Sequence, residues 1–332
     1  MKKVKQVLRS TIAALQGKRI LVIGDMVADI YLDGRISRIS REAPVLVLEQ
    51  AGEKIVAGGA ANVVNNIATL GGTVYAAGLV GADKEAQGLK DILAGNGAHT
   101  EGLLTDAARP TIAKTRIIAG GRATVSQQIV RIDRESREPM SPVLEAEMER
   151  YLAQVLPQID GVVISDYGAG TVTETLQKTL IAYCRRHGLP SMVDSRYAIH
   201  RFRHIGYVKQ NDAELAAAVG RSLHGADEII AAGRELLHEL EADGVLVTRG
   251  ELGMILIEKD GAVHDIPVSD KSEVFDVSGA GDTCVATVIL ALAAGVEPAR
   301  AAELSNIASG IAVRKLGTST VSSQELLQSL QE

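Results

Sequence analysis

The stretch EVFDVSGAGDTCVATVILALAAG, residues 273–295, sets two acids and two glycines directly before a long apolar run. The acids are Asp276 and Asp282, and the glycines are Gly279 and Gly281. The apolar run predicts a buried helix with a glycine turn at its start. Glycines at that place let another group come close to the backbone, so the turn is a candidate binding or catalytic element.

Two familiar phosphate-binding motifs do not fit this turn. A Walker A loop carries a lysine after its last glycine, and no lysine follows here. The dinucleotide fingerprint GxGxxG has Cys284 where its third glycine belongs. What remains is a Gly-Ala-Gly turn whose backbone N–H groups and helix dipole favour a phosphate or a developing negative charge.

Asp282 has two interpretations. A carboxylate beside an anion site repels the anion, so its useful role there is that of a general base toward a hydroxyl that attacks phosphorus. The alternative is a simple helix N-cap, worth about 1 kcal/mol. The spacing alone leaves both open.

Composition narrows the class of protein. The chain has 332 residues, 46% of them hydrophobic, and a net charge of −6, which allows a large core and argues against nucleic-acid or anionic-membrane partners. Cys184 and Cys284 lack a CxxC spacing, which favours a reducing cytoplasm. The apolar run Cys284–Val296 is shorter than the roughly 18 residues of a membrane-spanning helix.

Short apolar runs alternate with helical patterns along most of the chain. RILVIGD, Arg19–Asp25, predicts a buried strand, and the glycine-bounded segment Gly58–Gly72 predicts a helix. GVVISD, Gly161–Asp166, and GVLVTRG, Gly244–Gly250, predict further strands separated by helices. The alternation predicts an α/β fold with a largely parallel sheet covered on both faces.

Two segments interrupt this alternation. Residues 45–57 and 110–133 resemble β-hairpins around Ala-Gly and Ala-Gly-Gly-Arg turns. They are interpreted either as a solvated sheet face or as a lid over a polar ligand, and the lid is preferred. We therefore predict a lid of residues 31–57 and 110–133 on a core of residues 1–30, 58–109 and 134–332. Exposed lid edges also predict a homodimer formed through the lid.

Three ordered motifs resemble those of the ribokinase-like (PfkB-type) carbohydrate kinases. They are FDVSGAGDT at 275–283, AGGAANVVNNIATLGG at 57–72 and NDAE at 211–214. Further segments, among them QQIVRID at 127–133 and SDYGAG at 165–170, resemble the heptose kinases of ADP-heptose synthesis. The resemblance implies a three-layer α/β/α sandwich with a mostly parallel central sheet and a small β-sheet lid.

The same resemblance implies roles for individual residues. Asp282 is the implied catalytic base, with charge-stabilising amides from Gly279, Ala280 and Gly281. The implied substrate-binding residues are Asp25, Asp29, Gly58, Gly59, Asn62, Lys114, Arg116, Gln128, Arg131 and Asp166. The implied nucleotide-binding residues are Asn211, Glu214, Thr248, Gly250, Gly253 and Asn306. Glu214 is expected to act on Mg²⁺ through water, and a monovalent cation such as K⁺ is expected near Asp276, Ser278 and Thr320.

The sequence departs from the heptose-kinase pattern beside the sugar site. Ala169 stands where those kinases have a lysine, and DSR, residues 194–196, replaces DPK. Lys114, Arg116, Arg131 and Arg196 are candidates to hold a distal phosphate in place of that lysine. Simpler alternatives also exist, since Asp166 could only cap a loop and Glu214 could be a favourable first-turn charge.

The sequence therefore predicts a kinase that uses ATP and Mg²⁺ and phosphorylates a sugar phosphate. The preferred acceptor is O1 of D-glycero-β-D-manno-heptose 7-phosphate. One alternative is another sugar or sugar phosphate of the same family, and a second is a non-catalytic sugar- or nucleotide-binding regulator. The base at Asp282 argues against the regulator, because a binding protein gains nothing from it.

Overall fold

A nine-stranded sheet forms the centre of the molecule. The computed structural model describes residues 2–120, 126–268 and 274–330. The sheet order is β13-β12-β11-β10-β9-β8-β1-β4-β5; the pairs β11–β12 and β12–β13 are antiparallel, and the other pairs are parallel. The strands are β1 (Arg19–Gly24), β4 (Thr73–Val80), β5 (His99–Thr105), β8 (Gly161–Asp166), β9 (Ser191–Ser195), β10 (Tyr207–Asn211), β11 (Gly244–Thr248), β12 (Met254–Glu258) and β13 (Val263–Ile266).

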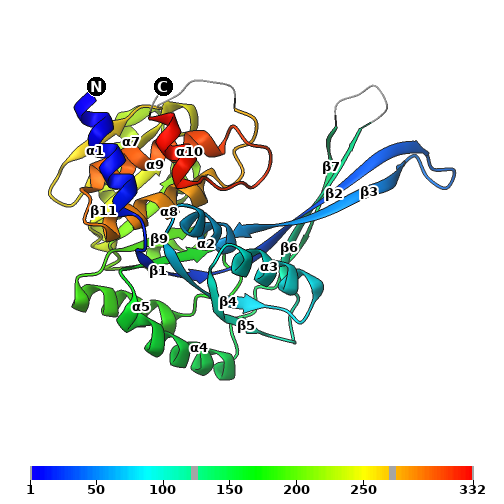
Figure 1. Ribbon diagram of the computed structural model, residues 1–332, viewed down its shortest axis with the longest axis horizontal. Coiled ribbons are helices and arrows are strands. Elements are labelled where there is room, and N and C mark those ends of the chain that lie inside the picture. The colour runs from blue at the N-terminus through cyan, green and yellow to red at the C-terminus, as the bar shows by residue number, and fades with distance from the viewer. Residues whose placement is uncertain (1, 121–125, 269–273, 331–332) are drawn as a thin grey trace.

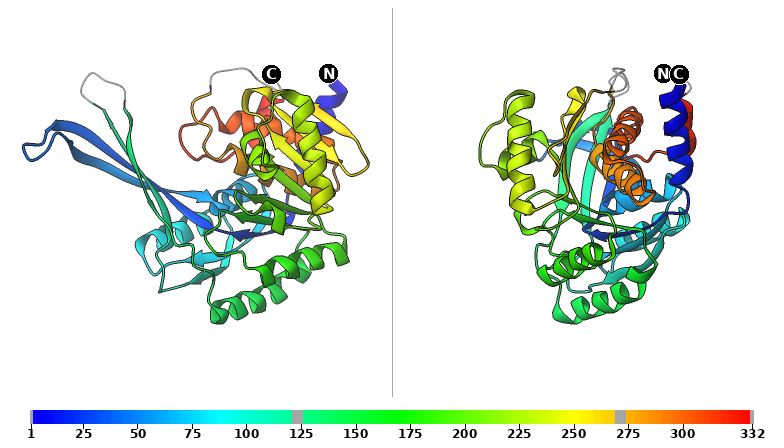
Figure 2. Two further views of the ribbon diagram at one scale, coloured as in Figure 1. Left: turned by 180° about the vertical axis from the view of Figure 1, so that it is seen from behind. Right: turned by 90° about the vertical axis from the view of Figure 1, so that its left-hand side faces the viewer.

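Helices cover both faces of this sheet, as Figure 1 and the edge-on view in Figure 2 show. One apolar cluster joins the sheet to α1 (Lys2–Ala14), α2 (Ala60–Thr69), α3 (Lys84–Gly95), α8 (Ala280–Ala293), α9 (Pro298–Ala312) and α10 (Ser323–Ser329). A second cluster joins the other face to α4 (Pro142–Val155), α5 (Glu174–His187), α6 (Asp212–Ala218) and α7 (Gly225–Leu240). The predicted α/β sandwich is confirmed.

The parallel strands set the position of the site. β1, β8, β9, β10 and β11 run in the same direction, so their carboxyl ends meet at one edge of the sheet. Asp25, Asp166, Asn211 and Thr248 lie at or next to those ends. Ligands of open α/β sheets bind in the crevice outside these ends.

A second sheet of four strands projects from the core as a long arm (Figures 1 and 2). Its order is β3-β2-β6-β7, with the central pair parallel. The strands are β2 (Met26–Ile39), β3 (Leu46–Gly59), β6 (Ile112–Gly120) and β7 (Gln127–Arg134). No described helix covers its outer half, so several large apolar side chains remain exposed on it: Ile39, Val45, Leu46, Val130 and Ile132.

The first predicted hairpin differs from the observed one. Ala51 and Gly52, expected to form its turn, lie inside β3, and β3 pairs instead with β2 along its whole length. The β2 strand begins at Met26, directly after the strand that ends at Gly24, so the arm starts earlier than predicted. The second hairpin pairs as expected, whereas residues 121 and 122 of its turn fall outside the described residues.

Arg109 ties the root of this arm to the core. Its guanidinium donates to the Asp106 carboxylate and to the backbone carbonyls of Glu138, Pro139 and Ala169. These partners come from the connection before β6, the connection after β7 and the loop after β8. One nearly buried side chain thus fixes both ends of the arm against the loop at the site.

Two further findings concern the chain as a whole. Cys184 and Cys284 are both free and buried. In the described part of the chain, every helix is too short or too polar to cross a lipid bilayer.

We expect Arg109→Ala to lower the free energy of unfolding by about 2 kcal/mol, because it leaves the carbonyl of buried Ala169 and the mostly buried Asp106 carboxylate without their charged donor. Urea denaturation followed by circular dichroism measures this change. Arg137→Ala is the matched control, since the Arg137 side chain is 74% exposed and Glu135 is its one ion-pair partner among the described residues. The control should change the free energy of unfolding by less than about 0.5 kcal/mol. Equal effects of the two substitutions would show that Arg109 does not fix the arm to the core.

Candidate active site

The turn at residues 276–282 ends in the first turn of α8. Gly279 is the N-cap of this helix, with φ 83°. Asp282 is the third helical residue, and the helix has no side-chain cap. The capping alternative for Asp282 is therefore wrong, and its carboxylate is directed to other partners.

Two side chains donate hydrogen bonds to the buried Asp282 carboxylate. Asn62 Nδ2, from α2, lies 2.8 Å from Oδ2, and the Tyr167 hydroxyl, from the loop after β8, lies 3.3 Å from Oδ1. Burial raises the pKa of Asp282 to about 7, and the negative charge of Asp194 also raises it, while Asn62, Lys209 and Tyr167 lower it. Such a carboxylate exchanges its proton near neutral pH, as a general base requires.

Tyr167 remains a hydrogen-bond donor. The negative charge of Asp282, followed by burial, raises the pKa of Tyr167 well above its ordinary value. Its backbone N–H donates to Asp25 Oδ2 at 2.8 Å, and the Lys114 ammonium lies 5.3 Å from its ring centroid. Tyr167 therefore connects Asp282 with one predicted sugar ligand and with the arm.

The two glycines of the turn are required by close contacts. A Cβ on Gly279 would lie 2.7 Å from Asn62 Nδ2, and the positive φ already disfavours other residues there. A Cβ on Gly281 would lie 3.0 Å from Lys209 Nζ. Glycine thus lets the helix start approach both the base's partner and a buried ammonium group.

A cavity of about 630 Å³ opens beside this turn. Its lining includes Ala280 and Gly281 from α8, Lys209, and apolar side chains such as Val268 and Val277. It also brings together five of the six predicted nucleotide-binding residues: Asn211, Thr248, Gly250, Gly253 and Asn306.

Lys209 is a buried ammonium on the wall of this cavity. It lies 3.1 Å from Asp194 Oδ2 and 3.7 Å from Glu214 Oε2. Although burial alone lowers the pKa of Lys209, the charges of Asp194 and Glu214 raise it above its ordinary value, so the positive charge persists.

Asn211 and Glu214 form a capping box at the start of α6. The Asn211 side chain accepts from the backbone N–H of Glu214, and the Glu214 side chain accepts from that of Asn211. The box explains the NxxE spacing structurally, and it leaves Asn211 on the cavity wall and Glu214 beside Lys209.

The predicted sugar ligands Asp25 and Asp29 lie between β1 and β2 and on β2, respectively. Asp25 accepts from the backbone of Tyr167 and Ala169 through Oδ2, whereas its buried Oδ1 has no protein partner among the described residues. Burial raises the pKa of Asp25. Asp29 accepts from Arg116 at 2.6 Å and from Thr318 at 2.8 Å.

Gly58 and Gly59 make room for these two acids. A Cβ on Gly58 would lie 2.5 Å from Asp29 Oδ2, and one on Gly59 would lie 2.9 Å from the Asp25 carbonyl. Both glycines end β3, and Gly59 is at the same time the N-cap of α2, which begins at Ala60.

The structure separates the predicted phosphate ligands. Arg116 is paired with Asp29, and Arg131 with Asp133. Arg131 and Gln128 are exposed on β7, and no described hydrogen bond or ion pair joins them to the residues around Asp282. Lys114, by contrast, has no carboxylate partner among the described ion pairs, and neither has Arg196.

Asp166 supports its own loop. Its carboxylate accepts from the Ser195 hydroxyl at 2.8 Å and from the Gly168 backbone N–H at 3.0 Å. Both oxygens are thus engaged by the protein, which favours the loop-capping alternative over a direct contact with sugar.

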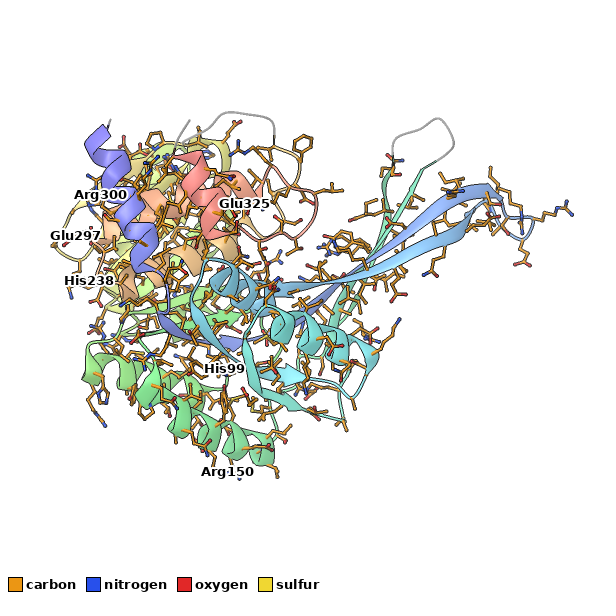
Figure 3. The ribbon with its side chains drawn as sticks, in the orientation of Figure 1. His99, Arg150, His238, Glu297, Arg300 and Glu325 are labelled. Atoms are coloured by element: carbon orange, nitrogen blue, oxygen red, sulfur yellow. The ribbon has the colours of Figure 1, made fainter. Side chains whose placement is uncertain are left out.

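The predicted cation residues lie in two environments. Asp276 accepts from the backbone N–H groups of Ser278 and Gly317. The carbonyl of Thr320 instead accepts from the Lys315 ammonium at 2.6 Å, and Lys315 also pairs with Glu325, labelled in Figure 3. The Lys315 ammonium is therefore already bound to one of the residues that was expected to bind a monovalent cation.

Sequence reasoning missed four residues of this site. They are Asn66, Tyr167, Asp194 and Lys209. Asn66, Tyr167 and Asp194 lie in the segments 57–72, 165–170 and 194–196 compared above with the kinases, but nothing in those segments indicates their contacts. Asn66 contacts Thr283, 217 positions away, and Tyr167 contacts Asp282, 115 positions away. Lys209 lies outside these segments, 15 positions from its partner Asp194.

Comparisons with known proteins agree with this arrangement. Residues 18–325 match the family model described as pfkB family carbohydrate kinase. The chain is 42% identical over 311 residues to the bifunctional protein HldE of Geobacter metallireducens, covering 93% of this chain and 62% of that protein. It is 39% identical to the HldE of Mesorhizobium japonicum, covering 97% and 64%. The chain thus spans less than two thirds of the length of these relatives.

Solved structures show the same fold. Arabidopsis thaliana ribokinase complexed with ribose and ATP superposes with a TM-score of 0.74 at 18% identity, covering 96% of this chain and 99% of that one. Escherichia coli phosphofructokinase-2 in complex with potassium gives 0.75 at 20% identity, covering 96% and 100%. The fold, the match along nearly the whole chain and the shared motifs agree, and this chain belongs to the pfkB family of carbohydrate kinases.

Proposed function

We propose that this chain uses ATP to phosphorylate a hydroxyl of a sugar phosphate, and that the acceptor is O1 of D-glycero-β-D-manno-heptose 7-phosphate. The observation that carries the proposal is the position of Asp282. Asp282 directly follows Ala280 and Gly281, which line the nucleotide cavity, and its carboxylate accepts from Tyr167, whose backbone N–H donates to the predicted sugar ligand Asp25. The motifs shared with the heptose kinases support the choice of sugar.

In the proposed reaction, Asp282 accepts the proton of the acceptor hydroxyl while that oxygen attacks the γ-phosphorus. The bond from this phosphorus to the bridging oxygen breaks, and ADP leaves. The N–H groups of Gly279, Ala280 and Gly281 stabilise negative charge on the transferred group. Lys209 adds a fixed positive charge on the cavity wall, which matters in a chain whose net charge is −6.

Mg²⁺ fits the site as a partner of the phosphates. Among the described residues, no three His, Cys, Asp or Glu side chains gather into a metal site. Mg²⁺ in kinases is held mainly by phosphates, waters and one or two carboxylates, and it neutralises phosphate charge. We propose that Glu214 acts on it through water. For K⁺, Asp276 offers a carboxylate, but Lys315 already supplies a positive charge at Thr320.

We also propose that the four-stranded sheet is a lid and that two copies pair through it. The exposed apolar side chains on this sheet, Ile39 and Leu46 near its tip and Ile132 nearer the core, support this pairing. The cytoplasmic location expected from the cysteines stays a prediction.

Asp282→Asn should lower kcat by about 10²–10⁴ and leave the affinity for ATP nearly unchanged, because the amide cannot accept the proton. A coupled assay for ADP measures the loss. Burial favours the protonated form of Asp282 relative to the unfolded chain, so the parent loses stability as pH rises from about 4 to about 7, and the loss levels off above 7. The melting temperature of the variant relative to the parent should therefore increase from pH 5 to pH 8. Unchanged turnover would show that Asp282 is not the base.

The parent enzyme should show kcat/KM for the sugar rising with pH and levelling off above an apparent pKa near 7. The reason is that burial raises the pKa of Asp282 to about 7, and only the carboxylate accepts a proton. Initial rates between pH 5.5 and 9 measure the profile. A rate independent of pH over this range would contradict a base with a raised pKa.

Lys114→Ala should raise KM for sugar phosphates by about tenfold or more and change KM for unphosphorylated sugars little, since an unpaired ammonium favours a distal phosphate. A screen of sugars and sugar phosphates, heptose 7-phosphate included, measures both. Lys54→Ala is the control, because Lys54 is exposed on β3 of the same sheet. Equal losses on both kinds of sugar would remove Lys114 from the phosphate site.

A further inference from the structure

Asn66 is a buried residue near the site. Among the described residues it does not line the nucleotide cavity, and it forms no hydrogen bond with the Asp282 carboxylate. It is fully buried in α2, one helical turn after Asn62. Its Oδ1 accepts from the Thr283 hydroxyl at 3.0 Å and from the Val321 backbone N–H at 3.3 Å. Its Nδ2 donates to Asn62 through the backbone carbonyl at 3.0 Å and Oδ1 at 3.2 Å, and reaches the Ser319 carbonyl at 3.5 Å.

Backbone groups fix which way the Asn66 amide points. The Val321 N–H can only donate, so it requires the oxygen of Asn66 on its side. The carbonyls of Asn62 and Ser319 can only accept, so they require the nitrogen on the other side. In a reversed Asn66 amide, the nitrogen would face the N–H donor of Val321, and the oxygen would face the carbonyl acceptors of Asn62 and Ser319. All three hydrogen bonds would be lost in a buried environment, where unpaired polar groups are costly.

This fixed amide then fixes the next one. Asn66 Nδ2 donates to Asn62 Oδ1, so the Asn62 nitrogen must face the other way, and it lies 2.8 Å from Asp282 Oδ2. A reversed Asn62 would place its oxygen against the carboxylate and its nitrogen against that of Asn66. The orientation set at Val321 is thereby transmitted through two amides to Asp282.

We infer that Asn66 is a positioning residue for the base: it locks the Asn62 amide so that Asp282 always receives a hydrogen-bond donor, which favours its carboxylate form. This inference deepens the proposed function and rests on it. A donor to a carboxylate favours its charged form. Without Asn66, Asn62 is free to turn its oxygen toward Asp282, and that arrangement is stable only when Asp282 is protonated.

Other groups that act on Asp282 come from different elements. The negative charge of Asp194 on β9 raises its pKa, whereas Lys209 on β10 and the hydroxyl of Tyr167 after β8 lower it. None of these is hydrogen-bonded to Asn66. Replacing Asn66 by an uncharged residue therefore changes the donor on Asp282 and leaves these charges in place.

The test uses Asn66→Leu, which is close in size and uncharged, and Asn66→Ala, which leaves room for water. We expect the acid limb of kcat/KM to move up by about one pH unit, so that the rate at pH 7 falls by about fivefold and recovers near pH 9. KM for ATP should stay within about twofold. Asn65→Leu is the control. It also removes an amide from α2, but the Asn65 side chain accepts from Asn96 at the surface.

A carbon-13 NMR titration of the Asp282 carboxyl, assigned with Asp282→Asn, measures the same shift without turnover. If the parent phosphorylates no sugar phosphate, the proposed function fails, and the titration still tests the role of Asn66. A folded Asn66 variant whose acid limb and titration coincide with those of the parent overturns the inference. Failure of both variants to fold would show that Asn66 is a structural residue, and this also overturns it.

Discussion

The site depends on a carboxylate that is buried and still able to ionise. Removing Asp282 from water disfavours its charge, and the neighbouring charge of Asp194 adds to that penalty. The donors Asn62 and Tyr167 and the charge of Lys209 act in the opposite direction. The balance holds the pKa of Asp282 near 7, where proton transfer to and from a base is most effective.

This balance explains why the surrounding backbone is rich in glycine. Asn62 and Lys209 must approach the start of α8 from opposite sides, and a side chain on Gly279 or Gly281 would occupy the space each needs. The same holds on the sugar side, where Gly58 leaves room for the Asp29 carboxylate. The glycine motifs are therefore packing requirements around charged groups as much as sites for bound phosphate.

The fold was predictable because its signal is local. Apolar runs ending in Gly-Asp or Ser-Asp mark β1 and β8, and periodic segments such as Gly58–Gly72 mark the helices between strands. The arm was only partly predictable, because the fourteen residues of β2 do not alternate regularly between polar and apolar, and the two residues of the expected turn lie inside its partner β3. Which residues touch Asp282 was less accessible still, since Asn62 lies 220 positions and Tyr167 115 positions away.

Whether a basic residue can bind the distal phosphate depends on the partner that it already has in the protein. Arg116 was a reasonable phosphate ligand by type, but it stacks near Tyr31 and pairs with Asp29, so its charge is already used inside the protein. Lys114 lies two residues earlier on the same strand face, and its ammonium contacts the ring of Tyr167 but forms no ion pair with a described carboxylate. A ring attracts an ammonium group less strongly than a phosphate does, because it carries no net charge. Lys114 can therefore exchange this partner for an anion at little cost, whereas Arg116 would have to leave a buried carboxylate unpaired.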